Sequence, residues 1–361
     1  MRILHTESSC GWGGQEIRIL DEAQGMSSRG HEVGIAAPRE SRIYEAALER
    51  GLRAEALPIA RKDLSGLLAM RRRLKAHEVD VVNSHSSTDS WLAALACATL
   101  ARAPALVRTR HVSAAVPDNL PTRWLYHRAT LHVVTTGEAL RLQLLRDNRL
   151  SPERVTSVPT GIDTERFVPG DREAARRVTG LPSGRRLVGI VATLRSWKGH
   201  RYLIEAVNGL PPGVGLVIVG DGPQRRNIET TVRELGMSER VWLAGNQRDV
   251  LPWLQSFDVF ALPSYANEGV PQALLQAMLC GLPCVTTTAG SIGEIARDGA
   301  TAIVVAAEDA ADLRRGLDLA LGDTELAARL GSAARAHCAA NFGAQTMLDR
   351  MERVFKDAAR L

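Results

Sequence analysis

Short apolar runs alternate with longer stretches of helical periodicity along the whole chain. In the first half, such runs are predicted as strands at 2–6, 32–37, 79–85, 105–111, 132–136 and 155–160. Helical spacing occupies the intervals between them, including 15–29 and 65–77. Because the runs are apolar on both faces and are separated by helices, the pattern predicts a parallel sheet covered on both sides.

The same alternation starts again after a segment rich in Pro, Gly and Asp at 158–171. The second series of predicted strands is 187–193, 215–222, 240–245, 259–263, 284–288 and 302–306. We therefore expect an α/β chain with two Rossmann-like domains, one over 1–165 and one over 166–343. The last stretch, 344–361, is predicted as a helix from the spacing of its apolar residues, which are Met347, Leu348, Met351, Val354, Phe355 and Ala358.

Composition narrows the class of protein. The chain has 361 residues, of which 45% are hydrophobic, and its net charge of +5 is small for this length. These values exclude a disordered chain and argue against a dedicated nucleic-acid binder. Five scattered cysteines without paired spacing predict reduced thiols, and the apolar run at 91–101 is too short to cross a bilayer. We expect a cytoplasmic protein.

Two loops that follow predicted strands suit a phosphorylated ligand. The first holds Gly13 and Gly14 ahead of a helix, where free amides and the positive end of the helix favour phosphate. The second holds Arg195 and Lys198 directly after the strand at 187–193, and these two cations can clamp a diphosphate. A simple tight turn and a pair of solvated surface cations remain the alternatives.

A third loop, after the predicted strand at 259–263, presents Glu268 just before a helix expected to start at 269–271. Glu268 can accept hydrogen bonds from sugar hydroxyls, whereas the ordinary role of a Glu at this place is a helix cap. Gln276 lies two helical turns further on and is expected on the same face. His111 ends the strand at 105–111, where a structural role is its alternative.

These residues resemble those of the retaining GT-B glycosyltransferases of family 4, which move a sugar from a nucleotide diphosphate donor. The matching segments are Val158-Pro159-Thr160-Gly161-Ile162-Asp163, Lys198-Gly199, Val219-Gly220-Asp221-Gly222-Pro223 and Glu268. Two positions depart from the family pattern. Thr193 stands where the family has Arg, and Gln276 stands where the family has the second Glu of its motif.

The resemblance implies two domains that face each other across a cleft, with the C-terminal helix crossing back to the first. It implies catalytic roles for His111, Glu268, Lys198 and Arg195. It implies donor binding by Gly13, Gly14, Thr193, Gly222, Gln247, Gly269, Val270 and Gln276. His85 is a weaker candidate for the same site.

The same resemblance implies a nucleotide-sugar donor, with UDP preferred, and a glycan or lipid-linked acceptor in surface-polysaccharide or lipopolysaccharide assembly. No Asp-x-Asp signature stands in a predicted cleft loop, so no metal or other cofactor is expected. A nucleotide-sugar 2-epimerase, a non-catalytic nucleotide-sugar-binding protein and an NAD oxidoreductase remain as alternatives.

One local segment, 61–75, carries six basic residues and one acidic residue among leucines at helical spacing. This pattern is typical of a helix that lies on an anionic membrane surface. It also fits a core-facing helix with a solvated basic side. We expect a cytoplasmic enzyme, peripheral at the inner face of the membrane if the first interpretation holds.

Overall fold

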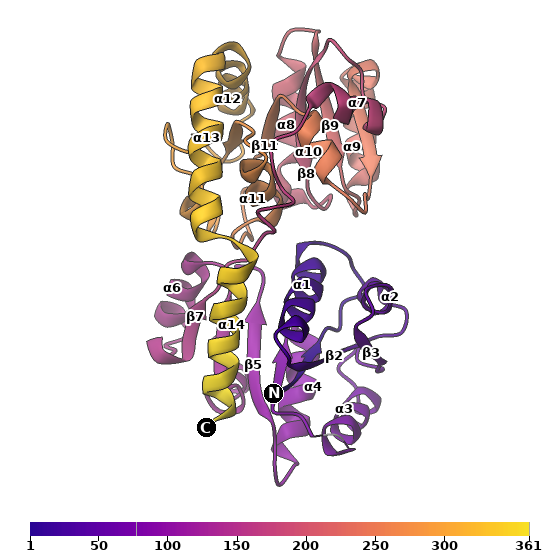
Figure 1. Cartoon of the computed structure of the whole chain (residues 1–361), viewed down its shortest axis with the longest axis vertical. Coiled ribbons are helices and arrows are strands. Elements are labelled where there is room, and N and C mark those ends of the chain that lie inside the picture. The colour runs from indigo at the N-terminus through magenta and orange to yellow at the C-terminus, as the bar shows by residue number, and fades with distance from the viewer. Residues whose placement is uncertain (77, 361) are drawn as a thin grey trace. The chain divides into compact units, whose positions relative to one another are not determined.

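The computed structural model describes residues 1–76 and 78–360. The chain divides into two compact units, one formed by 1–161 with the residues from 345 onwards and the other by 162–344 (Figure 1). The first boundary lies four residues before the predicted one because Ile162 pairs with Gly343. The N–H of Ile162 donates to the carbonyl of Phe342 at 2.9 Å, which ties Ile162 to the second unit.

The first unit contains, within the described residues, a parallel sheet in the order β3-β2-β1-β4-β5-β6-β7. Its strands are β1 (Arg2–Thr6), β2 (Glu32–Ala37), β3 (Arg53–Ala56), β4 (Val81–Ser84), β5 (Ala105–Arg110), β6 (His132–Thr135) and β7 (Val155–Ser157). Its helices are α1 (Gly14–Ser28), α2 (Arg42–Glu49), α3 (Leu64–Ala76), α4 (Ser87–Ala98), α5 (Leu120–Trp124), η1 (Leu125–Ala129), α6 (Glu138–Asp147), η2 (Pro152–Arg154) and α14 (Ala344–Ala359).

The two faces of this sheet have separate hydrophobic cores. Successive residues of a strand point to opposite faces, so Ile3 joins one core and Leu4 the other. Helices α1, α2 and α14 cover the face of Ile3, and α3, α4, η1 and α6 cover the face of Leu4. All six apolar residues predicted for the C-terminal helix are buried in the first core. His77, the predicted last residue of the 65–77 helix, and Leu361 lie outside the described residues.

The second unit contains a parallel sheet in the order β10-β9-β8-β11-β12-β13 among its described residues. Its strands are β8 (Arg186–Val191), β9 (Val214–Val219), β10 (Val241–Gly245), β11 (Val259–Leu262), β12 (Cys284–Thr286) and β13 (Ile303–Val304). Its helices are α7 (Arg172–Thr179), η3 (Ser196–Lys198), α8 (His200–Asn208), α9 (Arg225–Glu234), η4 (Ser238–Arg240), α10 (Leu251–Ser256), α11 (Gln272–Leu279), η5 (Ile292–Glu294), α12 (Ala310–Gly322) and α13 (Thr324–Asn341).

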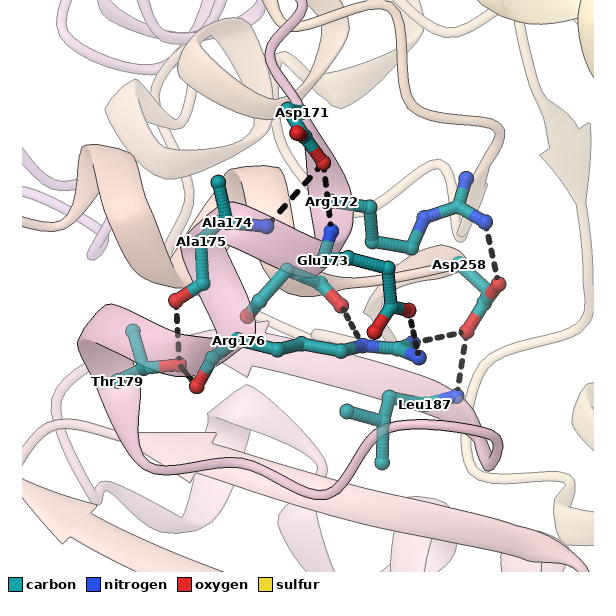
Figure 2. A network of polar contacts seen from close by, with 10 residues as sticks. Asp171, Arg172, Glu173, Ala174, Ala175, Arg176, Thr179, Leu187 and Asp258 are labelled. Carbon is teal, nitrogen blue, oxygen red and sulfur yellow. Dashed lines mark hydrogen bonds and ion pairs between the residues drawn. The ribbon is translucent and has the colours of Figure 1, made fainter.

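An ionic network centred on the buried Arg176 and Asp258 attaches the first helix of the second unit to its sheet (Figure 2). Asp171 caps α7 by accepting from two backbone amides of its first turn. Arg176 and Arg172 each donate to one oxygen of Asp258 at 2.8 Å, and the N–H of Leu187 donates to the oxygen shared with Arg176 at 2.7 Å. The Asp258 carboxylate therefore joins α7, the start of β8 and the start of β11.

Each sheet has one place where the strand order reverses. In the first unit it lies between β1 and β4, and in the second between β8 and β11. In open parallel sheets, ligands bind beyond the carboxyl ends of the strands at such a point. The predicted strands are all present, and several end a few residues early, as at Ser157 and Val219. The loops that the sequence singles out follow these strands.

Candidate active site

The clearest polar pair in the second unit joins Lys198 and Glu268. Lys198 ends η3, which follows β8, and Glu268 lies in the loop after β11. Their Nζ and Oε1 atoms are 2.6 Å apart. The Lys198 side chain is 17% exposed and that of Glu268 is 6% exposed. Two residues that the sequence predicts independently are thus brought together at the reversal of the sheet, with the cation still open to a ligand.

The backbone fixes the two loops against each other. The N–H of Tyr265 donates to the carbonyl of Trp197 at 2.9 Å. Gly199 has a φ of +75°, and a Cβ there would lie 2.1 Å from the carbonyl oxygen of Pro263. Only glycine allows this approach, because a side chain would meet backbone rather than a movable group. A glycine follows Lys198 in the sequence because only Gly199 lets the Lys198 loop lie against the Glu268 loop.

A second glycine holds the Glu268 backbone itself. Gly290 has a φ of +58°, and a Cβ on it would lie 2.0 Å from the carbonyl oxygen of Glu268. The N–H of Ser291 donates to the same oxygen at 3.3 Å. Asn267, just before Glu268, also adopts a positive φ of 59°. The position of Glu268 thus depends on a tight turn and on the loop after β12.

Arg195 lies apart from the Lys198–Glu268 pair. Its guanidinium is exposed and lies 5.7 Å from the centre of the Trp197 ring. Within the described part of the chain, no ion pair of Arg195 is seen. Thr193 accepts the N–H of Arg195 through its carbonyl at 2.8 Å, which forms a tight turn. The structure therefore pairs Lys198 with Glu268 and leaves the exposed Arg195 in the same loop but outside this pair.

The loops after β9 and β10 join this edge through the backbone. Gly222 packs so closely on the β8 loop that a Cβ would lie 2.8 Å from the backbone N and O of Leu194. The N–H of Gly220 donates to the carbonyl of Gly245 at 2.8 Å. Gln247 donates through Nε2 to the carbonyl of Ala244 at 2.7 Å, so its side chain stabilises its own loop.

The helix after Glu268 starts later than predicted. Helix α11 begins at Gln272, and Pro271 occupies its N-cap, so Gly269 and Val270 belong to the loop. The prediction that the helix starts at 269–271 was wrong because Pro271 takes extended backbone angles. Glu268 therefore does not share a helical face with Gln276. Gly269, Val270 and Gln276 are all buried in this region.

In the first unit, His111 follows β5 and belongs to a row of histidines. Its Nε2 lies 2.9 Å from Nδ1 of His85, and Nε2 of His85 lies 3.0 Å from Nδ1 of His5. Burial lowers the pKa of His5 to about 3 and holds the pKa of His85 and of His111 well below the usual range. The row is therefore uncharged at neutral pH.

The glycine loop of the first unit leads straight into α1. Gly13 is the N-cap of that helix and Gly14 its first residue, with Glu16 buried in the first turn. Burial and the nearby Glu7 carboxylate raise the pKa of Glu16 to about 7, against the effect of hydrogen bonds from backbone amides and Ser9. A carboxyl group of the protein thus lies beside the amides that were predicted to meet phosphate.

The buried carboxyl groups near this loop were not predicted from the sequence. Asp89 accepts from Thr6 Oγ1 at 2.8 Å and forms a capping box with Ser86 at the start of α4. Burial and the charge of Glu7 raise the pKa of Asp89 to about 7. The Ser-x-x-Asp spacing of Ser86 and Asp89 is a recognisable sequence signal for the cap, though not for its burial.

Most of the predicted basic segment 61–75 lies in α3, which begins at Leu64, so Arg61 and Lys62 precede the helix. The helix turns Gly66, Met70 and Leu74 inward, while Leu64 and Leu68 are 68% and 41% exposed. No helix within the described residues is long and apolar enough to span a bilayer. No group of three or more His, Cys, Asp or Glu side chains that could hold a metal ion occurs in the part of the chain that the structure describes.

Two family descriptions match successive parts of the chain. The family "Glycosyltransferase Family 4" matches residues 12–166, and "Glycosyl transferases group 1" matches residues 171–337. The D-inositol 3-phosphate glycosyltransferase of Mycolicibacterium paratuberculosis is 30% identical over 371 residues, which cover 91% of this chain and 82% of that protein.

Other similar proteins are named as glycosyltransferases or are solved in complex with a UDP sugar. The Escherichia coli UDP-Gal:alpha-D-GlcNAc-diphosphoundecaprenol alpha-1,3-galactosyltransferase is 28% identical over 242 residues, covering 63% of this chain and 62% of that protein. Among solved structures, HepE from Anabaena in complex with UDP-glucose superposes with a TM-score of 0.87 at 21% identity, covering 99% of this chain and 100% of that one. WaaG, a glycosyltransferase involved in lipopolysaccharide biosynthesis, gives 0.74 at 20% identity, with 99% of each chain covered.

Proposed function

Since this chain belongs to the GT-B glycosyltransferases of the family 4 type, we propose that it transfers a sugar from a UDP-sugar donor with retention of anomeric configuration. The observation that carries the proposal is the Lys198–Glu268 pair at the reversal of the second sheet. A cation beside a buried carboxylate suits a donor that carries a diphosphate at one end and sugar hydroxyls at the other.

Different residues act on the two parts of the donor, the leaving diphosphate and the transferred sugar. In the second unit, Lys198 and Arg195 stabilise the negative charge that develops on the departing diphosphate. In the first unit, the amides of Gly13 and Gly14 suit a phosphate group. Glu268 accepts hydrogen bonds from donor hydroxyls, and His111 orients the sugar.

The remaining predicted donor-binding residues act mainly through the backbone. Thr193, Gly222, Gly269 and Val270 shape the loops around the donor, and Gln247 lies in the loop that meets the base. The amide oxygen of Gln276 accepts a hydrogen bond from a ribose hydroxyl.

Retention follows from attack on the same face that the diphosphate leaves. The acceptor oxygen forms a bond to the anomeric carbon while the bond to the diphosphate oxygen breaks, and the acceptor proton passes to that oxygen. Cationic side chains supply the charge stabilisation, so the reaction is proposed to need no metal ion. Unchanged turnover after treatment with EDTA supports this point, and loss of turnover restored by Mg²⁺ contradicts it.

We propose a glycan or lipid-linked acceptor in cell-surface polysaccharide or lipopolysaccharide assembly on the cytoplasmic side of the membrane. Support comes from the named acceptor of the E. coli relative, a diphosphoundecaprenol-linked sugar, whereas the mycobacterial relative is named for inositol 3-phosphate. An acceptor screen should therefore include both a diphosphate-linked lipid sugar and inositol 3-phosphate.

The test is incubation of the purified chain with UDP, GDP and ADP sugars, followed by nucleotide release and thermal stabilisation. Selective release of UDP is the expected result. Epimerised sugar without transfer would favour a 2-epimerase, and stabilisation without any turnover would favour a binding protein. NMR of the product decides the anomeric configuration, and an inverted product contradicts retention.

The exposed Leu64 and Leu68, set among the basic residues of 61–75, support the proposal that α3 rests on an anionic membrane surface. Flotation with vesicles that contain an anionic lipid should carry the protein upward, and Leu68→Ser should weaken this. Leu142, 54% exposed on α6, offers a matched control substitution to Ser. Absence of binding to anionic vesicles contradicts the proposal.

A further inference from the structure

Three imidazole rings form a continuous row from the core of the first unit to the partly exposed His111. His5 lies on β1, His85 follows β4 and His111 follows β5, three neighbouring strands of the sheet. The ring centres are 5.3 Å apart for His5 and His85, and 5.2 Å apart for His85 and His111. His5 is fully buried and His111 is partly buried, so the row opens at the His111 end.

The surroundings keep all three rings neutral. Burial is the largest cause that lowers the pKa of each histidine, and the positive charge of the fully buried Arg18 on α1 acts in the same direction. Arg110 acts in the same direction on His111. Around the row, Asp89 accepts the backbone N–H of His85, and Glu22 pairs with Arg18 at 3.6 Å. Each ring therefore carries one N–H and one bare nitrogen.

Neutral rings in this arrangement must all donate in the same direction. Either every Nδ1 carries the proton and donates outward, or every Nε2 carries it and donates inward. The two states differ at the inner end, where Nε2 of His5 is buried without a hydrogen-bond partner among the described residues. A buried N–H without an acceptor is rarer in proteins than an acceptor without a donor. The outward direction is therefore the favoured one.

We propose that His85 and His5 are positioning residues that hold His111 as its Nδ1–H tautomer, so that His111 offers a hydrogen-bond donor to an oxygen of the sugar nucleotide. The identity of that ligand rests on the proposed function, whereas the tautomer is a property of the ligand-free chain. Because Nε2 of His5 has no hydrogen-bond partner in the described part of the chain, the row sets the direction of the hydrogen bond that His111 offers.

The tautomer can be measured directly. The full chain, labelled with ¹⁵N in its nine histidines, gives two-bond ¹H–¹⁵N correlation patterns that distinguish Nδ1–H, Nε2–H and doubly protonated rings. Single substitutions of His5, His85 and His111 assign the three signals. We expect all three rings to be Nδ1–H at neutral pH, and UDP-glucose to shift the His111 signal without changing its tautomer. An Nε2–H or cationic His111 overturns the proposal.

Two variants of His85 separate positioning from packing. His85→Phe keeps a ring of similar shape without hydrogen bonds, whereas His85→Asn places an amide near the former Nδ1, where it can still donate to Nε2 of His111. In His85→Phe, the correlation pattern of His111 should become that of mixed tautomers, and kcat/KM with a UDP sugar should fall by on the order of 10-fold or more, as for other orienting partners. His85→Asn should restore most of both.

Circular dichroism and thermal unfolding establish that each variant is folded before it is interpreted. A folded His85→Phe with an unchanged His111 pattern overturns the inference, as does equal turnover in the Phe and Asn variants. If no nucleotide sugar is turned over by the wild-type chain, the proposed function fails while the tautomer result stands. If turnover is found but His111 is Nε2–H, this inference alone fails.

Discussion

Replacement of Lys198 by Met is the sharpest test of the site in the second unit. Methionine keeps the length of the apolar stem and removes only the ammonium group, which lies 2.6 Å from Glu268 Oε1. The backbone contacts of the loop, between Tyr265 and Trp197 and at Gly199, do not involve this side chain. The variant therefore changes one charge within a loop that is held by other groups.

Two separate magnitudes follow from the structure. Loss of one preorganised charge partner of the leaving diphosphate should lower kcat by about 10²-fold to 10³-fold, or about 2.7–4 kcal/mol. Breaking a fully buried ion pair costs about 3–5 kcal/mol of the free energy of unfolding. The loss in Lys198→Met should be smaller, because the Lys198 side chain retains contact with solvent. We expect about 1–2 kcal/mol, since Glu268 can regain water on the side that Lys198 leaves.

The assay is steady-state turnover of the UDP sugar identified by the donor panel, with thermal unfolding of the same samples. Glu268→Gln is the matched variant, and the double variant tests coupling. If the two residues act as one unit, the double variant should lose no more than the worse single variant. Near-normal turnover of folded Lys198→Met, or fully additive losses, would refute the reasoning.

Three further predictions test the scaffold of both units. Asp258→Ala should destabilise the second unit by about 3–5 kcal/mol, because it removes the buried carboxylate that pairs with Arg176 and leaves this guanidinium, among the described residues, only the half-exposed Glu173 as an ion-pair partner. Glu173→Ala keeps the buried pair and should cost under about 1 kcal/mol. Hydrogen exchange read by mass spectrometry, which resolves the two units, measures both. Gly290→Ala should lower turnover, because its Cβ would push on the carbonyl of Glu268 in a positive-φ turn. The fractional loss of turnover should exceed the fractional loss of the free energy of unfolding measured without donor. Turnover equal to that of the wild type would contradict the role assigned to that turn. Burial raises the folded-state pKa of Glu16 to about 7. The free energy of unfolding of the wild type should therefore fall, relative to that of Glu16→Gln, by on the order of 3 kcal/mol as pH rises from about 4.5 to about 7. Urea unfolding at both pH values measures this difference, and a difference that does not change with pH would contradict the prediction.

The architecture was predictable because most strands are buried on both faces and therefore appear as continuous apolar runs. The exception is β3, whose sequence Arg53–Ala56 alternates charged residues with alanine at the edge of the first sheet. An edge strand that is partly exposed has no need of an apolar run, so its signal is absent. The start of α11 was misplaced for a local reason, since Pro271 does not enter the helix.

For the site, the sequence identifies which loops matter but not which side chains meet. Lys198 and Glu268 were each predicted from their position after a strand, yet their contact depends on β8 lying beside β11, which no local pattern specifies. His111 was predicted in the same way. His5 was missed because it lies inside an apolar strand, although its position near the end of β1 matches that of His85 and His111 once the strand order is known.

The assignment of the last helix to the first unit has a consequence for biosynthesis. Met347, Met351 and Phe355 belong to the same core as residues of β1 and α1, which leave the ribosome more than three hundred residues earlier. On one face of the first sheet, a nascent chain therefore exposes the apolar area that α14 later covers beside α1 and α2, throughout translation of the second unit. Domains usually fold in order of synthesis. Here the later unit can complete its core first, and the earlier one must remain protected from aggregation until the final helix arrives.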